Sequence, residues 1–408
     1  MAEVTSQPIA PPIAQPTAQP IAQPPRGFPD DEFAGRLMRA QIRMAAEGLD
    51  GLLLTTEPEI RYFSGFLTRF WESPTRPWFL LIPATGAPIA VIPEIGADCM
   101  ARGYVEDIRT WASPNPMDEG LSLLSATIRE QLGPAPRLGL PMGAESYLRM
   151  ALSDYARLQA LLPEAAWVDC TAIIRALRMV KSAREIEKIA YICDLVSGVF
   201  ENLPNFVTRG MSEAEIFRRF KIACLEAGAD DVIYLVGGAA PGGVGDIISP
   251  PSERATADGD ILMLDTGAVF DGYFCDFDRN YAFGTVDQAA HDAYAIAFEA
   301  TEAGFATAKP GATCAQVFQA MADVISAAGR AEGGVGRMGH GLGMQLTEWP
   351  SNAAWDDTVI EPGMVLTLEP GLAIGPGRVM VHEENIIIHE GGADYLTRRA
   401  PVKMPQIG

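Results

Sequence analysis

The sequence lacks the cysteine pairs of disulfide frameworks and thiolate zinc sites, and it lacks the long apolar runs of membrane spans. Its six cysteines lie far apart and form no Cys-x-x-Cys pair, a spacing that favours reduced thiols in a cytoplasmic protein. No apolar run approaches the ~18 residues of a membrane-spanning helix. Only four histidines occur among the 408 residues, so any metal site must be built mainly from carboxylates.

Positive charge is scarce as well. The chain has 31 Lys and Arg against 52 Asp and Glu, a formal net charge of −21, and no basic run offsets this balance locally. We therefore expect no binding to nucleic acid and none to membrane surfaces. The length and a hydrophobic content of 48% are sufficient for two domains with cores of ordinary size.

Three segments differ in their residue patterns. Residues 1–28 form a Pro/Ala/Gln repeat without the basic and apolar parts of a signal peptide, and we expect a disordered tail there. Residues 29–170 alternate helical and strand patterns, which predicts an α/β domain. Ser182 and Glu185 form a capping box that opens a long helix in the second domain, residues 171–408. We expect helices at 31–47, 121–131, 146–162, 291–309 and 313–329, and strands at 51–55, 78–83, 88–93, 364–369 and 379–389.

Residues 261–283 have the pattern of a β-hairpin. Hydrophobic strand residues flank Asp271 and Gly272, a pair that is the strongest short-range signal for a two-residue turn. Such a turn fixes the register of the hairpin, with Phe270 facing Tyr273.

This register places three carboxylates on one face of the hairpin. Asp265 lies opposite Asp278 and diagonal to Asp276, because side chains alternate with a period of two. Like charges in this arrangement destabilise a sheet, and a multivalent cation between them removes the penalty. The hairpin is therefore predicted to form half of a metal site.

Further candidate ligands follow downstream. His340 lies between glycines in Gly-His-Gly-Leu-Gly, where the backbone can approach a ligand closely. Glu369 ends one apolar strand pattern and Glu383 interrupts another, and such buried acids are costly unless they are paired or bind a metal. Four carboxylates and one imidazole suit a close pair of Mn, Co, Fe or Zn ions. The predicted metal ligands are Asp265, Asp276, His340, Glu369 and Glu383.

The order and context of these five residues resemble the creatinase/aminopeptidase superfamily, peptidase family M24. Residues 60–66 (IRYFSGF) are similar to its N-terminal domain, residues 177–187 are similar to the helix that opens its catalytic domain, and the two hairpin ligands are eleven positions apart, as in the family. The resemblance implies an α+β fold, in which a pita-bread catalytic domain (171–408) follows a smaller α/β domain (29–170). It also implies two divalent ions that bridge a water or hydroxide, with Glu369 as bridging ligand and proton shuttle.

The sequence departs from the Xaa-Pro peptidases of the family at two substrate-holding histidines. Thr347 stands at one of these positions, and Ile248 is the best match to the other. The segment Glu348-Trp349-Pro350 partly resembles the dimethylsulfoniopropionate lyases of the superfamily. Two functions therefore remain open: hydrolysis of an Xaa-Pro-like amide bond, or a reaction of a small compatible solute or betaine-like compound. Asp278 or Glu348 is a candidate base in either case, with Thr347 beside the substrate.

The resemblance also implies a homodimer. In this fold a loop of the N-terminal domain commonly reaches the site of the partner subunit. We expect Trp71, Arg76 and Trp78 near that site, where aromatic rings and a guanidinium can hold a carboxylate or a quaternary cation. The expected substrate is a short peptide or another small molecule.

Overall fold

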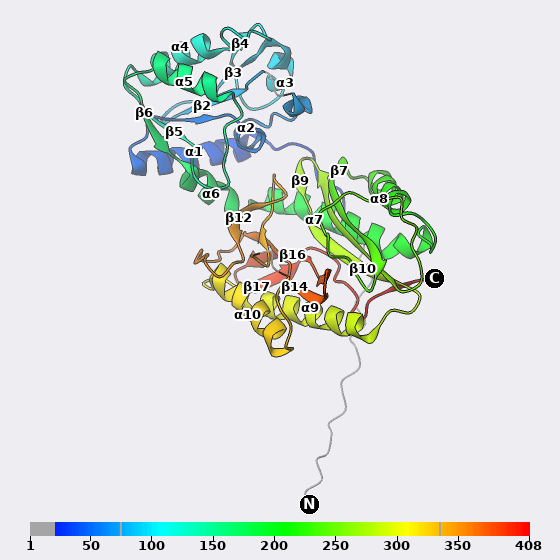
Figure 1. Cartoon of the computed structure of the whole chain (residues 1–408). Helices are drawn as coiled ribbons and strands as arrows, with labels where there is room; N and C mark the ends of the chain where they lie inside the picture. The colour runs from blue at the N-terminus through cyan, green and yellow to red at the C-terminus, as the bar shows by residue number, and fades with distance from the viewer. Residues whose placement is uncertain (1–20, 74–75, 334–335) are drawn as a thin grey trace, which may run out of the picture.

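The computed structural model describes residues 21–73, 76–333 and 336–408. Figure 1 shows two domains, with the blue and cyan N-terminal domain above the green, yellow and red C-terminal domain. Within the described residues, no helix combines the length and the apolar character that crossing a membrane requires.

The N-terminal domain is a six-stranded mixed sheet covered by helices. The strand order is β4-β3-β2-β1-β5-β6, with β2 antiparallel to both of its neighbours and the other pairs parallel. The apolar strand residues pack against the helices on the two faces in separate clusters. The elements are α1 (Asp30–Glu47), β1 (Gly51–Leu54), α2 (Glu57–Ser64), β2 (Phe79–Pro83), β3 (Ile89–Pro93), α3 (Ala97–Met100), β4 (Asp107–Trp111), α4 (Leu121–Leu132), β5 (Arg137–Leu140), α5 (Leu152–Leu161) and β6 (Ala166–Asp169).

Helix α5 begins later than the periodicity predicts. Residues 146–151 are not helical, because tertiary contacts hold this segment in another conformation. The Arg149 backbone N–H donates to Thr55 Oγ1, and its guanidinium donates to the carbonyls of Trp71, Ser73 and Arg76.

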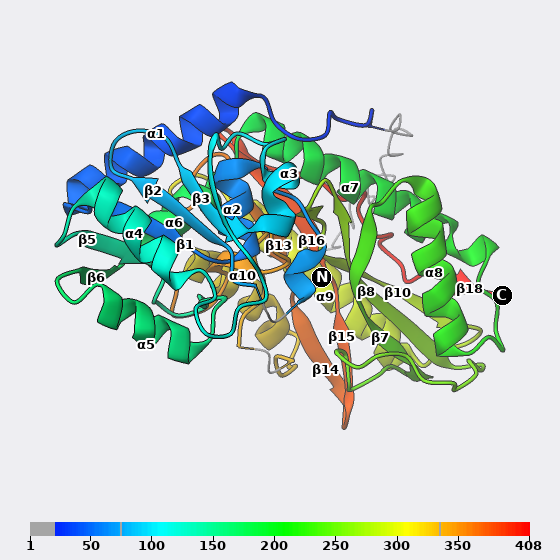
Figure 2. The ribbon, with the colours of Figure 1, turned by 90° about the horizontal axis from the view of Figure 1, so that it is seen from above.

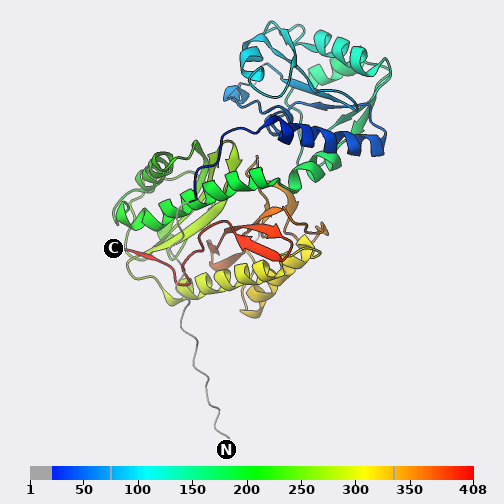
Figure 3. The same ribbon diagram turned by 180° about the vertical axis from the view of Figure 1, so that it is seen from behind.

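The C-terminal domain contains two curved sheets between two helical layers, and a further two-stranded sheet, β14-β15. One sheet has the order β18-β10-β8-β7 with β9 on β8, and the other has the order β12-β11-β13-β16-β17. From behind, the green helix α7 and the yellow helices α9 and α10 cover opposite sides of the strands (Figure 3). Its helices are α6 (Thr171–Met179), α7 (Ala183–Asn202), α8 (Glu213–Ala227), α9 (Gln288–Thr307) and α10 (Cys314–Ala327). Its strands are β7 (Asp231–Pro241), β8 (Asp260–Phe270), β9 (Tyr273–Phe274), β10 (Phe277–Phe283), β11 (His340–Gly341), β12 (Glu348–Ser351), β13 (Val365–Leu368), β14 (Gly371–Gly375), β15 (Arg378–Val381), β16 (Glu384–His389), β17 (Gly392–Tyr395) and β18 (Gln406–Ile407).

The hairpin has the register that its turn predicts. Phe270 pairs with Tyr273, and Asp265 pairs with Asp278. Asp271 and Gly272 have φ angles of 44° and 67°, which is the left-handed conformation that a two-residue type I′ turn requires. The local turn chemistry therefore fixes which side chains share one face of this sheet.

Of two other expectations, the capping box is confirmed and the single strand at 379–389 is wrong. Ser182 accepts a hydrogen bond from the Glu185 backbone while the Glu185 carboxylate accepts one from the Ser182 backbone, so the capping box is present at the start of α7. The strand expected at 379–389 is instead two strands, β15 and β16, which are separated at His382 and Glu383. This interruption turns Glu383 toward the neighbouring sheet.

Part of the predicted tail is packed against the protein. The Arg26 guanidinium pairs with Asp230 at 2.7 and 2.5 Å, and the Gly27 N–H donates to Asp271 Oδ2 at 2.9 Å. The Phe28 ring lies edge-on to Tyr273, 5.9 Å between centroids. Residues 21–28, hereafter the strap, lead into α1 alongside α7 (Figure 2). The expectation of disorder is wrong for the strap, and for residues 1–20 it lies outside the described residues.

Candidate metal centre

The five predicted ligands come from both sheets of the C-terminal domain. Asp265 lies on β8, and Asp276 lies between β9 and β10. His340 begins β11, Glu369 follows β13, and Glu383 lies in the interruption between β15 and β16. The two sheets face each other here, so residues far apart in the sequence meet between them.

The five side chains form two groups that share Asp276. Ligand atoms of Asp276, His340 and Glu369 lie within 4.8 Å of one another, and those of Asp265, Asp276 and Glu383 do as well. His340 Nε2 is 3.0 Å from Glu369 Oε1 and 3.3 Å from Asp276 Oδ2. Two adjacent sets of ligands, carboxylate oxygens with one imidazole nitrogen, joined by one shared carboxylate are an arrangement that can hold two divalent ions.

The electrostatics of the site also fit cations. Asp265 Oδ1 is buried without a hydrogen-bond partner among the described residues. Burial, together with Asp276 and Asp278, raises the pKa of Asp265 well above its usual value. Burial and then Asp265 raise the pKa of Glu383 in the same direction. Carboxylates gathered in this way favour a bound cation, because it removes both their desolvation cost and their mutual repulsion.

Neighbouring groups orient the His340 imidazole. Its Nδ1 lies 2.9 Å from the Gly341 carbonyl, to which an Nδ1–H donates, so Nε2 faces the carboxylates. Burial acts to lower the pKa of His340, but Glu369 and Asp276 outweigh it and raise the pKa to about 10. Thr367 connects the two ligands, because its hydroxyl accepts from the His340 N–H and donates to Glu369 Oε1.

Three polar residues next to the predicted ligands hold the ligand backbone, and a fourth, Asn280, holds one of these three. Asp278 Oδ1 accepts from the Glu383 N–H at 2.7 Å, and Asp278 Oδ2 accepts from Asn280 at 2.7 Å. The Asn385 side chain accepts from the Asp276 N–H at 3.0 Å and donates to the Asp276 carbonyl. Arg279 donates to the Glu383 carbonyl at 2.8 Å. No role was assigned to Asn280, Arg279 or Asn385 from the sequence. Their position as polar residues inside apolar strands could have indicated that they bond to groups of the site.

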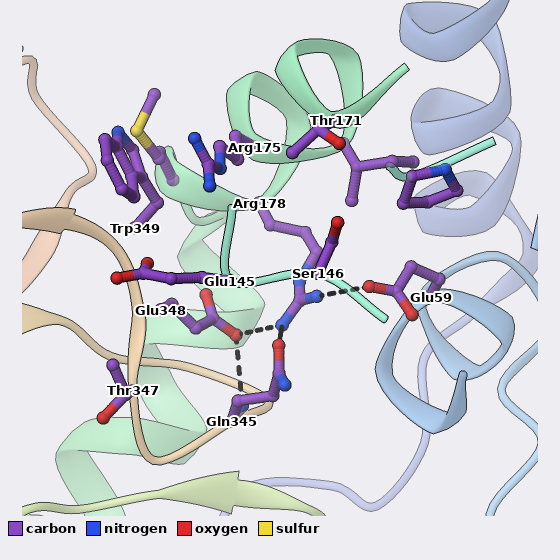
Figure 4. Close-up of a pocket in the computed structure, with 13 residues that line it drawn as sticks. Glu59, Glu145, Ser146, Thr171, Arg175, Arg178, Gln345, Thr347, Glu348 and Trp349 are labelled. Atoms are coloured by element: carbon purple, nitrogen blue, oxygen red, sulfur yellow. Dashed lines mark hydrogen bonds and ion pairs between the residues drawn. The ribbon is translucent and has the colours of Figure 1, made fainter. Parts of the chain in front are cut away.

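The structure gives Glu348 a different environment from the one expected of a base. Its carboxylate pairs with Arg178 at 2.5 Å and accepts from the Gln345 N–H at 3.1 Å (Figure 4). It also pairs with Lys181 at 3.2 Å. Burial opposes its ionisation, but Arg178 and then Lys181 lower the pKa of Glu348 to about 2. A carboxylate held by two cations is a poor proton acceptor, so we assign no base role to Glu348 below.

Two cavities lie where the domains meet. One, of about 290 Å³, is lined by residues of both domains, including Thr347 and Glu348 (Figure 4). The other, of about 890 Å³, lies between the N-terminal domain and the hairpin. None of the five predicted ligands is among the described residues that line either cavity. Ile248 is 74% exposed in the segment after β7.

The aromatic residues expected near a partner subunit differ in exposure. Trp78 is only 1% exposed and packs against Trp71 and Phe66 in the core of its domain. Its own domain covers this ring, so Trp78 offers little surface to a partner, and its expected position near a partner's site stays a prediction. Trp71 lines the larger cavity, and the Arg76 guanidinium stacks over Phe70 at 4.9 Å.

Comparisons with known proteins agree with this fold. Residues 187–390 match the model of metallopeptidase family M24, and residues 36–180 match the creatinase/prolidase N-terminal domain. A probable dipeptidase, PepE of Mycobacterium tuberculosis, is 31% identical over 368 residues, which are 89% of this chain and 93% of that protein. An Xaa-Pro dipeptidase of Pyrococcus horikoshii is 27% identical over 87% of this chain and 94% of its own length. The crystal structure of dipeptidase PepE from Mycobacterium ulcerans is similar with a TM-score of 0.82 and 28% identity, covering 93% of this chain and 99% of that one.

The chain therefore belongs to metallopeptidase family M24. The predicted two-domain fold, with a creatinase-type domain before a pita-bread domain, is confirmed. So is the predicted class of enzyme, a metal-dependent hydrolase with peptidase-like cleavage of an amide bond.

Proposed function

We propose that this enzyme hydrolyses the amide bond of short peptides, with Xaa-Pro dipeptides as the first candidates. The observation that carries the proposal is the pair of ligand groups that share Asp276. We propose that Asp265, Asp276, His340, Glu369 and Glu383 hold two divalent ions, chosen from Mn, Co, Fe and Zn. The names of relatives support the substrate, since they include dipeptidases and Xaa-Pro dipeptidases.

Two divalent ions at this site would supply an activated water and polarise the substrate carbonyl. The residues around them have separate roles. Glu369 Oε1 accepts from Thr367 and faces His340 Nε2, which leaves Oε2 to take a proton from the attacking water and pass it to the leaving nitrogen. Asp278 fixes the Glu383 backbone and Asn385 fixes that of Asp276, so we give both residues a positioning role.

The replacement of two histidines affects the rate expected on proline peptides. Thr347 and Ile248 supply no imidazole to hold the substrate or to stabilise the tetrahedral intermediate. An oxyanion donor is typically worth ~3 kcal/mol, which is about a hundredfold in rate. We therefore expect slower hydrolysis than in a relative that has both histidines, unless another cation in the site replaces them.

The test uses purified full-length protein. Metal is removed with a chelator, and Mn, Co, Fe or Zn is added back while metal content and release of the N-terminal residue from Xaa-Pro dipeptides are measured. We expect two ions per chain and metal-dependent release. Asp265→Asn should lose metal and activity together, whereas Asp246→Asn, on an exposed loop, serves as the matched control. Full activity after thorough demetallation, or turnover of betaine-like solutes without any peptide cleavage, would overturn the proposal.

We also propose a cytoplasmic homodimer. Six free cysteines support a reducing compartment, and the position of Trp71 beside the larger cavity supports a role for this loop, together with Arg76, at a partner's site. Sedimentation of the purified protein tests the dimer directly. A monomer with full activity would contradict a site that depends on a second subunit.

A further inference from the structure

A buried thiol on α7, that of Cys193, lies one side chain away from the candidate metal centre. Cys193 is fully buried, and its S–H donates to Asn385 Oδ1 at 3.2 Å. The same oxygen accepts from the Asp276 N–H at 3.0 Å, and Asn385 Nδ2 donates to the Asp276 carbonyl. Cys193 therefore bonds to the amide that holds both backbone groups of a predicted ligand.

The surroundings keep this thiol in the form that donates. Burial, and then Cys275, raise the pKa of Cys193 well above its usual value, so the group is an S–H and not a thiolate. The other α7 side chains buried beside it include Ile189, Ile192 and Val196, which offer no acceptor. The oxygen of the Asn385 amide thus receives two donors while its nitrogen supplies one, which fixes the direction in which the amide points.

Helix α7 holds the ligand hairpin at two points. Lys188 pairs with Asp271 Oδ2 at 2.7 Å at the turn, and Cys193 reaches Asp276 through the amide. The two contacts are five positions apart on the helix (188 to 193) and five positions apart on the hairpin (271 to 276). Since the backbone of an α-helix is held by its own hydrogen bonds, α7 fixes the turn and the ligand relative to each other.

We infer that Cys193 is a positioning residue for Asp276, because its S–H fixes the amide that fixes the backbone of the carboxylate shared by both ligand groups. This inference rests on the metal centre of the proposed function and not on the substrate. The bond is a single one between a thiol and a neutral oxygen. Its loss should therefore change metal affinity about threefold to tenfold, in line with one hydrogen bond of ordinary net strength.

The first test compares the metal affinity of Cys193→Ala, Cys193→Ser and the control Cys224→Ala. Cys224, on α8, is also fully buried, but its thiol makes no hydrogen bond to a described residue, so the control reproduces the loss of volume alone. Competition with a chromophoric chelator measures Mn²⁺ binding. We expect Cys193→Ala to weaken binding about threefold to tenfold and Cys224→Ala to leave it unchanged. Cys193→Ser should recover part of the affinity, because a hydroxyl also donates. Equal affinities in the two alanine variants would show that Cys193 contributes only packing.

A double-mutant cycle tests whether the effect passes through Asn385. In the Asn385→Ala background Cys193→Ala should cause no further loss of metal affinity, because the amide on which the thiol acts is gone. If the losses caused by the two substitutions multiply instead, the thiol acts by another route and the inference is wrong.

Hydrogen exchange in the metal-free protein separates this inference from the proposed function. The Asp276 N–H donates to Asn385 Oδ1, so its exchange rate, followed by NMR, reports on this bond without metal or substrate. We expect exchange about threefold to tenfold faster in Cys193→Ala than in Cys224→Ala. If no peptide is cleaved but this difference is seen, the proposed function fails and the positioning role stands. If the Asp276 N–H exchanges alike in both variants, the positioning role fails whatever the activity.

Discussion

Arg61, in the N-terminal domain, donates from Nη1 to the carbonyl oxygen of Gly272 at 3.0 Å, at the tip of the hairpin that carries Asp265 and Asp276. Its Nη2 donates to the neighbouring Asp271 carbonyl. A Cβ at Gly272 would lie 1.6 Å from Nη1, so only glycine allows this approach. One domain thereby holds the turn that sets the register of the ligands in the other.

Replacing Arg61 should weaken both the fold and metal binding. Arg61→Met leaves two buried carbonyls without their donors, at a cost of about 2 to 4 kcal/mol in the free energy of unfolding. We expect a lower midpoint in urea and weaker metal binding, measured by competition with a chromophoric chelator. Arg39→Met, which removes a guanidinium bonded to the Tyr62 hydroxyl, is the matched control and should leave metal affinity unchanged. Unaltered metal affinity in Arg61→Met would show that the hairpin keeps its position without the clamp.

Removing the strap should destabilise the protein, whereas removing the residues before it should not. Residues 1–20 have the composition of a dispensable tail, but Phe28 packs on Tyr273 and Gly27 bonds to Asp271. Phe28→Ala alone should lower the free energy of unfolding by about 2 kcal/mol, because an aromatic contact and its buried area are lost. Urea unfolding of a chain lacking residues 1–20, a chain lacking residues 1–28 and Phe28→Ala decides this. Equal stability of all three would mean that the strap contributes nothing to folding.

The ion pairs of Glu348 should make the free energy of unfolding decrease at acid pH. The pKa of Glu348 is about 2 in the folded protein, against 4.5 ordinarily, so its contribution is complete above pH 4.5 and is lost as the pH falls toward 2. This shift corresponds to about 3 kcal/mol. We expect Glu348→Gln to be destabilised at pH 7, because Arg178 and Lys181 lose their buried partner. The difference between the two proteins should shrink as the pH approaches 2, and a constant difference between pH 7 and pH 3 would contradict the assignment.

The metal-free protein should lose stability as the pH rises. In the folded state burial raises the pKa of Asp276 to about 6 and that of Asp278 to about 8. At low pH both groups are protonated in the folded and in the unfolded chain, so they do not affect the free energy of unfolding. Between pH 4 and pH 8 they ionise more readily in the unfolded chain, where their pKa values are ordinary, and the free energy of unfolding falls. Added metal should reverse this loss, and its binding should release protons. Thermal melting of metal-free and metal-loaded protein at pH 5 and pH 8 measures the effect; an equal gain from metal at both would contradict it.

Asn385 offers a direct test of ligand positioning. Its amide accepts from the Asp276 N–H and donates to the Asp276 carbonyl, so both ends are used. Asn385→Asp keeps the shape and removes the donor, and it should weaken metal binding about tenfold to a hundredfold. Chelator competition measures the affinity. Gln41→Glu, at an amide of the N-terminal domain that donates to the backbone carbonyls of Pro83 and Gly86, controls for the general cost of the change.

The convergence of the five predicted ligands could be anticipated because the signals that single them out are local. The Asp271-Gly272 turn sets the register of three aspartates, and acids inside apolar strands single out Glu369 and Glu383. The order of the strap was not predicted, because a proline-rich composition indicates only that a segment forms no stable structure by itself. Phe28 and Gly27 are held by residues more than two hundred positions away in the sequence. The burial of Trp78 and the late start of α5 likewise depend on tertiary contacts that periodicity does not contain.

The clamp of Arg61 on the hairpin turn constrains how this architecture can be recombined. A chimera that joins this catalytic domain to the N-terminal domain of a relative will retain an undistorted turn only if the donor brings a guanidinium to the same two carbonyls. Exchange of the N-terminal domain, although it contributes none of the five predicted ligands, therefore amounts to a change in the metal centre itself.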